Sequence, residues 1–181
     1  MTDLFFFINS GWGPFWDRLM VLLSREDVIY AFFVTISAIL VKRLGNRGLL
    51  APILAFVLVI GADFLCARGL KPLIARPRPY ANTTGIRVYK GGRFFRVEKP
   101  IPARSFSFPS CHAINTATAA GFFSTVDPVL APAVIVFSFM VGLSRVYLGH
   151  HWPEDVLFGW FLGGLIGFAG GLIWRRRIRD S

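Results

Sequence analysis

Charged residues are scarce in this sequence, and acidic ones are scarcer than basic ones. Only 17% of its 181 residues are charged, with twenty Lys and Arg against ten Asp and Glu. A soluble domain has roughly a quarter of its residues charged. The hydrophobic fraction is 54%, and long stretches carry almost no charge. The composition argues against a soluble domain and indicates a helical membrane protein, in which each span needs roughly 20 mainly apolar residues.

Cysteine is nearly absent, since Cys66 and Cys111 are the only two. Two cysteines do not make a disulfide framework or a zinc site, so we expect Cys66 to be a small buried apolar residue and Cys111 to carry a free thiol. The apolar residues 4–8 have no basic leader and no cleavage site, so no cleavable signal peptide is expected. The net charge of +10 comes without a nucleic-acid motif. Anionic lipid headgroups or a topology signal therefore explain it better than nucleic acid.

Five apolar segments are long enough, with their flanking turns, to cross a bilayer. They cover residues 28–41, 49–67, 112–125, 129–148 and 155–174. Residues 1–24 are interrupted by polar residues, Gly and Pro, and we predict one or two amphipathic helices in the membrane interface, with a true span as the alternative. The expected fold class is an all-α integral membrane bundle of five to six transmembrane helices, with an N-terminal amphipathic helix, in one domain over residues 1–181.

Glycine recurs every fourth residue in the last apolar segment. The repeat consists of Gly159, Gly163, Gly167 and Gly171. This spacing puts the four glycines along one helix face, and small residues allow helices to approach closely in a bilayer. The segment at 112–125 is also rich in small residues. The pattern predicts a tightly packed helix pair.

Basic residues predict the topology of the chain. The basic turn at residues 42–47 and the basic tail after Trp174 are both expected in the cytoplasm by the positive-inside rule. The loop at residues 68–111 and the turn at 149–155 then share the outer face with the N-terminal helix. The loop carries ten Lys and Arg, more than either inside segment. This contradicts the rule unless the loop charges bind anions.

Three clusters of polar residues fall on that outer face, at residues 71–79, 109–112 and 144–155. Two arginines and a lysine from these clusters can surround a phosphoryl group, Arg in a bidentate manner and Lys as a point charge. Ser110 precedes a predicted helix start, whose free N–H groups favour an anion. The clusters therefore indicate phosphate chemistry.

His151 and Asp155 lie four residues apart across Pro153, which suits a first helical turn. The carboxylate can hold the imidazole N–H and fix its tautomer, and an oriented neutral imidazole is a competent nucleophile toward phosphorus. His112 is left to protonate the leaving oxygen. His150 lacks the four-residue relation to Asp155 and is the less favoured alternative nucleophile.

The clusters resemble the motifs of the type 2 phosphatidic acid phosphatase family, which is related to vanadium haloperoxidases. The family motifs are K-x6-R-P, P-S-G-H and S-R-x5-H-x3-D. They read here as Lys71-x6-Arg78-Pro79, Pro109-Ser110-Cys111-His112 and Ser144-Arg145-x5-His151-x3-Asp155. The spacing inside each motif matches, and the resemblance extends from about residue 60 to 165.

The resemblance implies that His151 forms a phosphohistidine, that His112 acts as general acid and that Asp155 orients His151. It implies no metal and no other cofactor. The residues expected to bind the substrate phosphate are Lys71, Arg78, Ser110, Cys111 and Arg145. Cys111 stands where the family usually has Gly, but its backbone N–H is still available to phosphate. A free thiol there would make the enzyme sensitive to alkylation.

Other charged residues have less certain tasks. The loop cations form either a solvated surface or a headgroup site for a substrate with more than one phosphate. They are Arg87, Lys90, Arg93, Arg96, Lys99 and Arg104. Arg76 is expected to be structural. Asp63 lies within a span and needs a partner, for which Arg68, Arg25 or a catalytic cation are the candidates.

The expected substrate is a lipid phosphate whose chains stay in the bilayer and which enters from the side. The resemblance covers bacterial lipid A 1-phosphatases, undecaprenyl diphosphate phosphatases and phosphatidylglycerol phosphate phosphatases. The polybasic loop favours lipid A 1-phosphate, and a location in the bacterial inner membrane with the site facing outward is expected. Membrane lipids are the other expected partners. A transporter for an anionic lipid or phosphate is the alternative from another class.

Overall fold

The computed structural model describes residues 2–179, without the side chains of residues 46, 47, 178 and 179. The side chain of Arg47 in the predicted basic turn, and the last residues of the tail, therefore lie outside the described part. The helices are α1 (Thr2–Asn9), α2 (Pro14–Leu23), α3 (Glu26–Leu44), the 3-10 turn η1 (Gly45–Gly48), α4 (Leu50–Phe64), the π-helical η2 (Leu65–Leu70), α5 (Lys71–Ile74), α6 (Pro79–Asn82), α7 (Cys111–Val126), the 3-10 turn η3 (Pro128–Leu130), α8 (Ala131–Tyr147) and α9 (Pro153–Arg179). The strands are β1 (Arg87–Lys90) and β2 (Arg93–Arg96).

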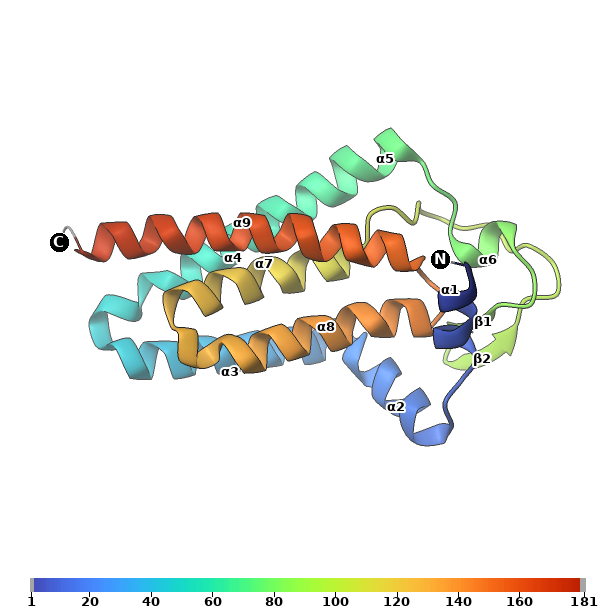
Figure 1. Ribbon diagram of the computed structural model, residues 1–181, viewed down its shortest axis with the longest axis horizontal. Coiled ribbons are helices and arrows are strands. Elements are labelled where there is room, and N and C mark those ends of the chain that lie inside the picture. The colour runs from blue at the N-terminus through green and yellow to red at the C-terminus, as the bar shows by residue number, and fades with distance from the viewer. Residues whose placement is uncertain (1, 180–181) are drawn as a thin grey trace.

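The long helices α3, α4, α7, α8 and α9 run along the longest axis of the molecule (Figure 1). The short helices α1, α2 and α6 and the two strands gather at one end, and α9 ends at the other. At that opposite end, Arg43 at the close of α3 pairs with Asp127 in the turn after α7, at 2.5 Å. The predicted turn at Asp127 is therefore confirmed, and it lies beside the end of α3.

Within residues 2–179, three helical stretches are long and apolar enough to cross a membrane. They are Leu50–Asn82, Pro128–Tyr147 and Pro153–Arg177. Helix α3 carries charged residues in its first and last turns, and α7 has only 16 residues, so neither is among the three. The helical membrane fold is confirmed, while the number of five or six spans stays a prediction.

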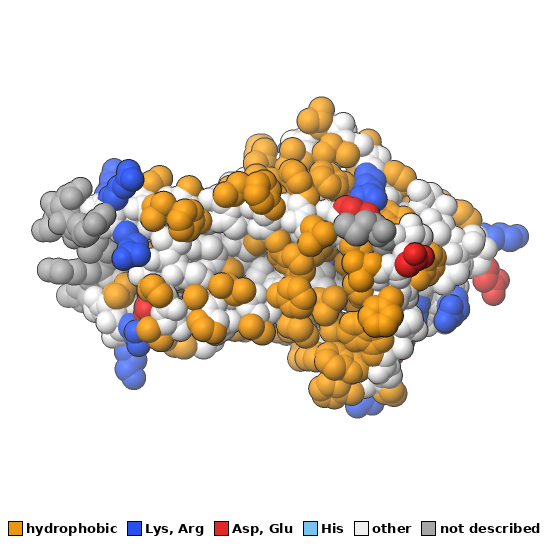
Figure 2. Space-filling view, viewed as in Figure 1, with side chains coloured by type: hydrophobic (Ala, Val, Ile, Leu, Met, Phe, Trp, Pro, Cys, Tyr) orange, Lys and Arg blue, Asp and Glu red, His pale blue; other side chains and the backbone are white. Residues whose placement is uncertain are grey.

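The helix surface between the two ends is apolar. Figure 2 shows charged side chains gathered toward the two ends of the molecule, with hydrophobic and uncharged surface between them. The exposed apolar side chains on α4 and α9 include Ile53, Phe56, Val57, Phe64, Phe161, Phe168 and Ile173. A water-soluble surface rarely exposes apolar side chains over so wide an area, and in a bilayer these side chains face lipid tails.

The predicted glycine face of α9 packs directly on α7. A Cβ atom on Gly163 would collide with the carbonyl oxygen of Ile114, and one on Gly167 with that of Thr118. On the α7 side, small residues such as Ala113 and Ala117 meet the glycines. The close helix pair is confirmed, and it fixes the start of α7 against the start of α9.

The segment at 68–111 is more ordered than a loop. The helix that begins as α4 continues through η2 and α5 to Ile74 and stops at Ala75, whose φ of 49° is left-handed. Farther on, β1 and β2 pair as an antiparallel hairpin, so the all-α prediction is wrong at this point. Gly91 and Gly92 form its turn with positive φ, which glycine adopts without a Cβ penalty.

Cys66 and Cys111 form a disulfide, with their Cα atoms 5.7 Å apart. The prediction that the two cysteines make no disulfide is wrong, and so is the expected free thiol at Cys111. The bond joins η2 to the first residue of α7 across 45 residues of chain. It therefore ties the segment before Lys71 to the start of the helix that carries His112.

Residues 2–23 form two short helices, as predicted. Phe5 of α1 lies against Trp152 in the turn before α9, with ring centroids 4.8 Å apart. The Asn9 amide donates to the carbonyl oxygens of Arg87 and Tyr147, at 2.6 and 2.9 Å. The N-terminal helices thus brace the hairpin and the end of α8. Their place in the membrane interface stays a prediction.

Candidate active site

The three motif clusters meet at one end of the bundle, where α7 and α9 begin. The backbone N–H of Ser110 donates to the carbonyl oxygen of Asp155 at 3.0 Å, which joins the second motif to the third. The guanidinium of Arg78 donates to the carbonyl oxygen of His150 at 3.0 Å, which joins the first to the third. The close α7–α9 packing explains why residues more than 40 positions apart come together.

His151 is buried, with 2% of its surface exposed. Its Nδ1 lies 3.5 Å from Oδ2 of Asp155, longer than a hydrogen bond, and its Nε2 lies 3.5 Å from Nη1 of Arg78. Burial, and then the charges of Arg78, Arg145 and Lys71, hold the pKa of His151 well below its usual range. The ring is therefore neutral at pH 7, the state that a nucleophile needs.

Asp155 is fully buried and held by several donors. Its carboxylate accepts hydrogen bonds from the Ser107 hydroxyl, from the Trp152 backbone N–H at 2.9 Å and from Arg76 at 2.8 Å. This network fixes the carboxylate beside Nδ1 of His151. The sequence offered no signal for Ser107. It offered a weak one for Arg76, which shares the Arg-Pro repeat with Arg78.

His151 forms a cationic cradle together with four residues around it. These four are Lys71, Arg78, Ser110 and Arg145. The Lys71 ammonium donates to the carbonyl oxygen of Phe106 at 2.7 Å, and Arg78 donates to the Ser105 hydroxyl at 2.9 Å. Arg145 donates to the hydroxyl of Ser24.

Three polar groups of the cradle are buried without a hydrogen-bond partner in the described residues, and one of them is Nδ1 of His151. The other two are the Ser110 hydroxyl and Nε of Arg145. Buried polar groups are seldom left unpaired, and these two are donors suited to an anion. The cradle can therefore take up a phosphoryl group.

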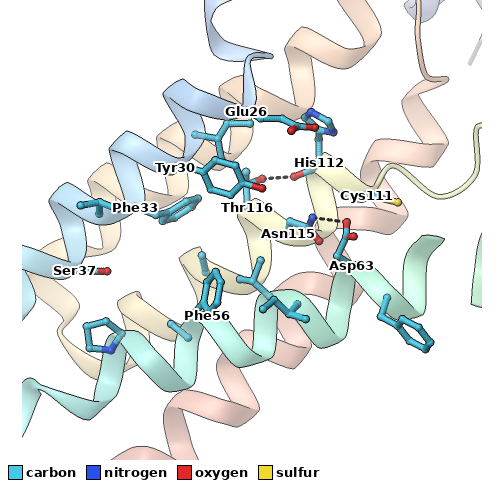
Figure 3. A pocket seen from close by; sticks show the side chains of 18 of the residues that line it. Glu26, Tyr30, Phe33, Ser37, Phe56, Asp63, Cys111, His112, Asn115 and Thr116 are labelled. Carbon is cyan, nitrogen blue, oxygen red and sulfur yellow. Dashed lines mark hydrogen bonds between the residues drawn. The ribbon is translucent and has the colours of Figure 1, made fainter. Parts of the chain in front are cut away.

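Next to the cradle, a groove of about 740 Å³ runs between α3 and α4, with α7 at its base. Its wall is mostly apolar, from side chains such as Phe33, Phe56 and Val59. His112 lines one end of the groove, and Glu26 of α3 lines the groove as well (Figure 3). Glu26 was not singled out from the sequence. The α3–α4 groove thus leads from the proposed acid along the apolar face of the helices.

Asp63 is bonded to Asn115, a partner that was not predicted from the sequence. Its Oδ1 accepts a hydrogen bond from the Asn115 amide at 2.7 Å, inside the α3–α4 groove (Figure 3). The candidates considered were cations, but Arg25 pairs with Asp27 instead, at 2.6 Å. No hydrogen bond or ion pair joins Arg68 to Asp63 in the described chain. A polar pair thus connects α4 to α7 at the level of the groove.

His150 does not face Asp155. Its Nε2 donates to the carbonyl oxygen of Tyr89 in β1 at 2.9 Å. The ring therefore links the hairpin to the turn that carries His151. Burial, and then the charge of Arg145, lowers the pKa of His150 to about 3. The side chain is engaged in the fold, which agrees with its lower rank as a nucleophile.

The loop cations divide into two groups. Arg87 forms a two-bond pair with Asp17, at 2.8 and 2.5 Å, and its guanidinium lies 3.8 Å from the ring centroid of Phe94. It therefore holds α2 to the hairpin. The other cations are exposed: Lys90, Arg93, Arg96, Lys99 and Arg104.

Comparison with known proteins gives consistent results. The model of the PAP2 superfamily matches residues 52–179. A lipid A 4'-phosphatase of Bacteroides thetaiotaomicron is 30% identical over 92% of this chain and 73% of its own length. An undecaprenyl-diphosphatase of Sulfolobus acidocaldarius is 30% identical over 92% of this chain and 75% of its own length.

A solved structure gives the same result for the fold. The transmembrane PAP2-type phosphatidylglycerolphosphate phosphatase of Bacillus subtilis matches with a TM-score of 0.64 and 27% identity, over 96% of this chain and 84% of that one. The region matched by the PAP2 model contains all three clusters, and the N-terminal helices that brace them lie before it. From the family match and the convergence of the clusters it follows that this chain belongs to the PAP2 superfamily and is a membrane-associated phosphatase.

Proposed function

We propose that the protein removes phosphate from a membrane lipid through a phosphohistidine on His151, without a metal. One observation carries the proposal: a buried neutral histidine lies against three cations, and an apolar groove reaches the same place beside His112. A phosphoryl group fits the cationic cradle, and a lipid chain fits the α3–α4 groove. This arrangement suits a substrate that is anionic at one end and apolar at the other.

The proposed reaction has two steps. Nε2 of His151 attacks phosphorus, and the bond from phosphorus to the lipid oxygen breaks. His112 gives that oxygen the proton that it takes up when the anionic substrate binds beside Arg145. Water then attacks the phosphohistidine, His112 takes a proton from the water, and inorganic phosphate and free His151 are released. Lys71, Arg78 and Arg145 stabilise the charge on the equatorial oxygens, which is the larger part of catalysis in phosphoryl transfer.

The backbone N–H groups at the start of α7 complete the proposed site. Cys111 is the first residue of this helix, where unpaired N–H groups favour an anion, whereas the N–H of Ser110 is already bonded to Asp155. The disulfide leaves the backbone N–H of Cys111 unchanged, so its proposed role in phosphate binding does not depend on a free thiol.

For the lipid, we favour lipid A carrying a 1-phosphate. The exposed cations of the hairpin loop suit a headgroup with several anionic groups. The relative from Bacteroides thetaiotaomicron bears the name of a lipid A 4'-phosphatase, which supports lipid A as the lipid but not the choice of its 1-phosphate. Undecaprenyl diphosphate and phosphatidylglycerol phosphate are the alternatives, because other relatives bear the names of enzymes for them.

We further propose that the active site opens on the outer side of the bacterial inner membrane, with five or six spans and a cytoplasmic C-terminus. The disulfide between Cys66 and Cys111 supports this orientation, since disulfides form and persist in oxidising compartments. The basic residues at the end of α9 support it as well.

The test is release of inorganic phosphate by the detergent-purified protein from a panel of lipid phosphates, with and without a chelator. We expect release from at least one lipid, unchanged by the chelator. Activity lost on chelation and restored by metal would contradict the metal-free mechanism. Transport of the lipid or of phosphate by reconstituted protein, without hydrolysis, would favour the transporter instead.

A further inference from the structure

The α3–α4 groove is not purely apolar, and its polar part has a fixed place. Asn115 lies three residues after His112 on α7, which is about 4.5 Å farther along the helix axis. Both side chains line the groove, and so does Asp63 from α4. A carboxylate and an amide therefore lie about one helical turn below the proposed general acid, at the depth where the backbone of a bound lipid would follow its phosphate.

The hydrogen bond between the two side chains leaves one carboxylate oxygen for a ligand. Asn115 donates to Oδ1 of Asp63, and no donor to Oδ2 is found in residues 2–179. Asp63 is exposed to the groove, whereas Oδ1 of Asn115 is buried and has no partner there. The amide is thus held with its nitrogen toward the carboxylate, and Oδ2 remains a strong acceptor.

We propose that Asp63, positioned by Asn115, selects lipid phosphates that carry a hydroxyl or amide N–H on the backbone next to the phosphate. This inference rests on the proposed lipid phosphatase function and names its substrate class. A carboxylate oxygen binds such a donor, gains nothing from an ester-linked backbone without one, and loses solvation beneath a hydrocarbon chain. Polyprenyl phosphates are therefore disfavoured, and lipids with hydroxyl or amide groups near the phosphate are favoured.

The alternative task for this pair is to hold two helices together, since polar side chains join helices in membranes. That task would not distinguish one lipid from another. A purely structural pair would also not explain why Oδ2 of Asp63 is exposed to the groove that His112 lines. Substrate selectivity is thus the readout that separates the two tasks.

The experiment compares three probes in the same detergent: ceramide 1-phosphate, phosphatidic acid of matched chain length, and a polyprenyl phosphate. Ceramide 1-phosphate carries a hydroxyl and an amide near its phosphate, and the other two carry no donor there. We expect the wild type to prefer ceramide 1-phosphate in kcat/KM by about tenfold, the size of one hydrogen bond to a charged group. In Asp63→Ala this preference is lost, while phosphatidic acid is still hydrolysed, which shows that the variant is folded.

Val59→Ala is the matched control, because Val59 lies one turn from Asp63 on α4 and lines the same groove without a polar group. It should change kcat/KM for the three lipids alike. Equal use of all three lipids by the wild type, or an unchanged preference in Asp63→Ala, would overturn the selectivity while the phosphatase function stands. No phosphate from any lipid would overturn the proposed function itself.

Discussion

The cationic cradle and the α3–α4 groove lie side by side but are built differently. The cradle draws its side chains from turns and helix ends, such as the turn at His151, and backbone carbonyl groups hold Lys71 and Arg78 in place. The groove is formed by the sides of three helices, and apolar residues make most of its wall. The difference indicates a division of labour. In the proposed function, the cradle performs the chemistry on any phosphate, and the groove selects the lipid that carries it.

The largest expected effect is on the cradle alone. His151→Ala should lower phosphate release by at least about 10³-fold for every substrate, because the nucleophile is lost. The groove is untouched, so binding of a fluorescent lipid should persist. His150→Ala serves as the control, since His150 bonds to the hairpin and not to Asp155, and it should keep more activity than His151→Ala. Equal losses in the two variants would contradict the assignment.

A second substitution weakens the cradle without removing the nucleophile. Arg145→Ala should lower kcat by about 10²- to 10³-fold, for lipid and water-soluble phosphate esters alike, because a charge on the equatorial oxygens loses its partner. Arg145→Lys restores the charge but not the bidentate geometry, and it should recover only part of the rate. Full activity of Arg145→Ala would show that this guanidinium does not contact the phosphate.

The disulfide borders both regions, since it joins η2 to the start of α7. Cys66→Ser should lower the free energy of unfolding by about 3 kcal/mol, roughly a hundredfold in the folded-to-unfolded ratio, because a cross-link that closes 45 residues is lost. The measurement is thermal unfolding in detergent, with Cys111→Ser and the reduced wild type as parallels. The untreated wild type should also resist alkylation. Rapid alkylation of Cys111 would show that no disulfide is present.

A substitution in the groove should impair hydrolysis of lipids and leave hydrolysis of soluble phosphate esters intact. Ser37 lines the groove away from the cradle, and Ser37→Trp would fill part of its volume. We expect lipid hydrolysis to fall by about tenfold, while hydrolysis of a short water-soluble phosphate ester is unchanged. Ser37→Ala, which leaves the groove open, should retain both activities. Equal losses for both substrates in the Trp variant would mean that the groove does not hold the lipid.

The smallest expected effect concerns pH and the cradle. His150 and His151 have lowered pKa values in the folded protein because they are buried among cations. The unfolded chain therefore binds more protons below about pH 6.5, and stability is full above that pH and falls below it. The free energy of unfolding should drop by about 1 kcal/mol from pH 7 to pH 6. In His150→Gln this drop should be smaller than in the wild type, and an unchanged drop would contradict its cause.

The sequence was sufficient to predict the repeated glycines and the chemically reactive motif residues. The glycine repeat predicted the α7–α9 contact because only small residues allow that approach. The motif residues were predicted because few other side chains can attack phosphorus or bind its oxygens. The sequence also predicted most helices to within a few residues, since their apolar runs are long.

The sequence was not sufficient where tertiary packing alone brings residues together. Cys66 and Cys111 are too few for a framework pattern, and only the fold sets their Cα atoms 5.7 Å apart. Ser107 is an ordinary loop serine until Asp155 lies beside it. The bond between Asp63 and Asn115 likewise depends on the packing of α4 against α7, which no local pattern encodes. The hairpin was missed because its strands have only four residues each.

The most direct measurement is capture of the phosphoenzyme. The protein is mixed with a lipid carrying ³²P in its phosphate, quenched in alkali, digested and mapped by mass spectrometry. The proposed mechanism predicts acid-labile label on His151 in the wild type and none in His151→Ala. Label on another residue, or turnover in which no label is ever captured on His151, would contradict it.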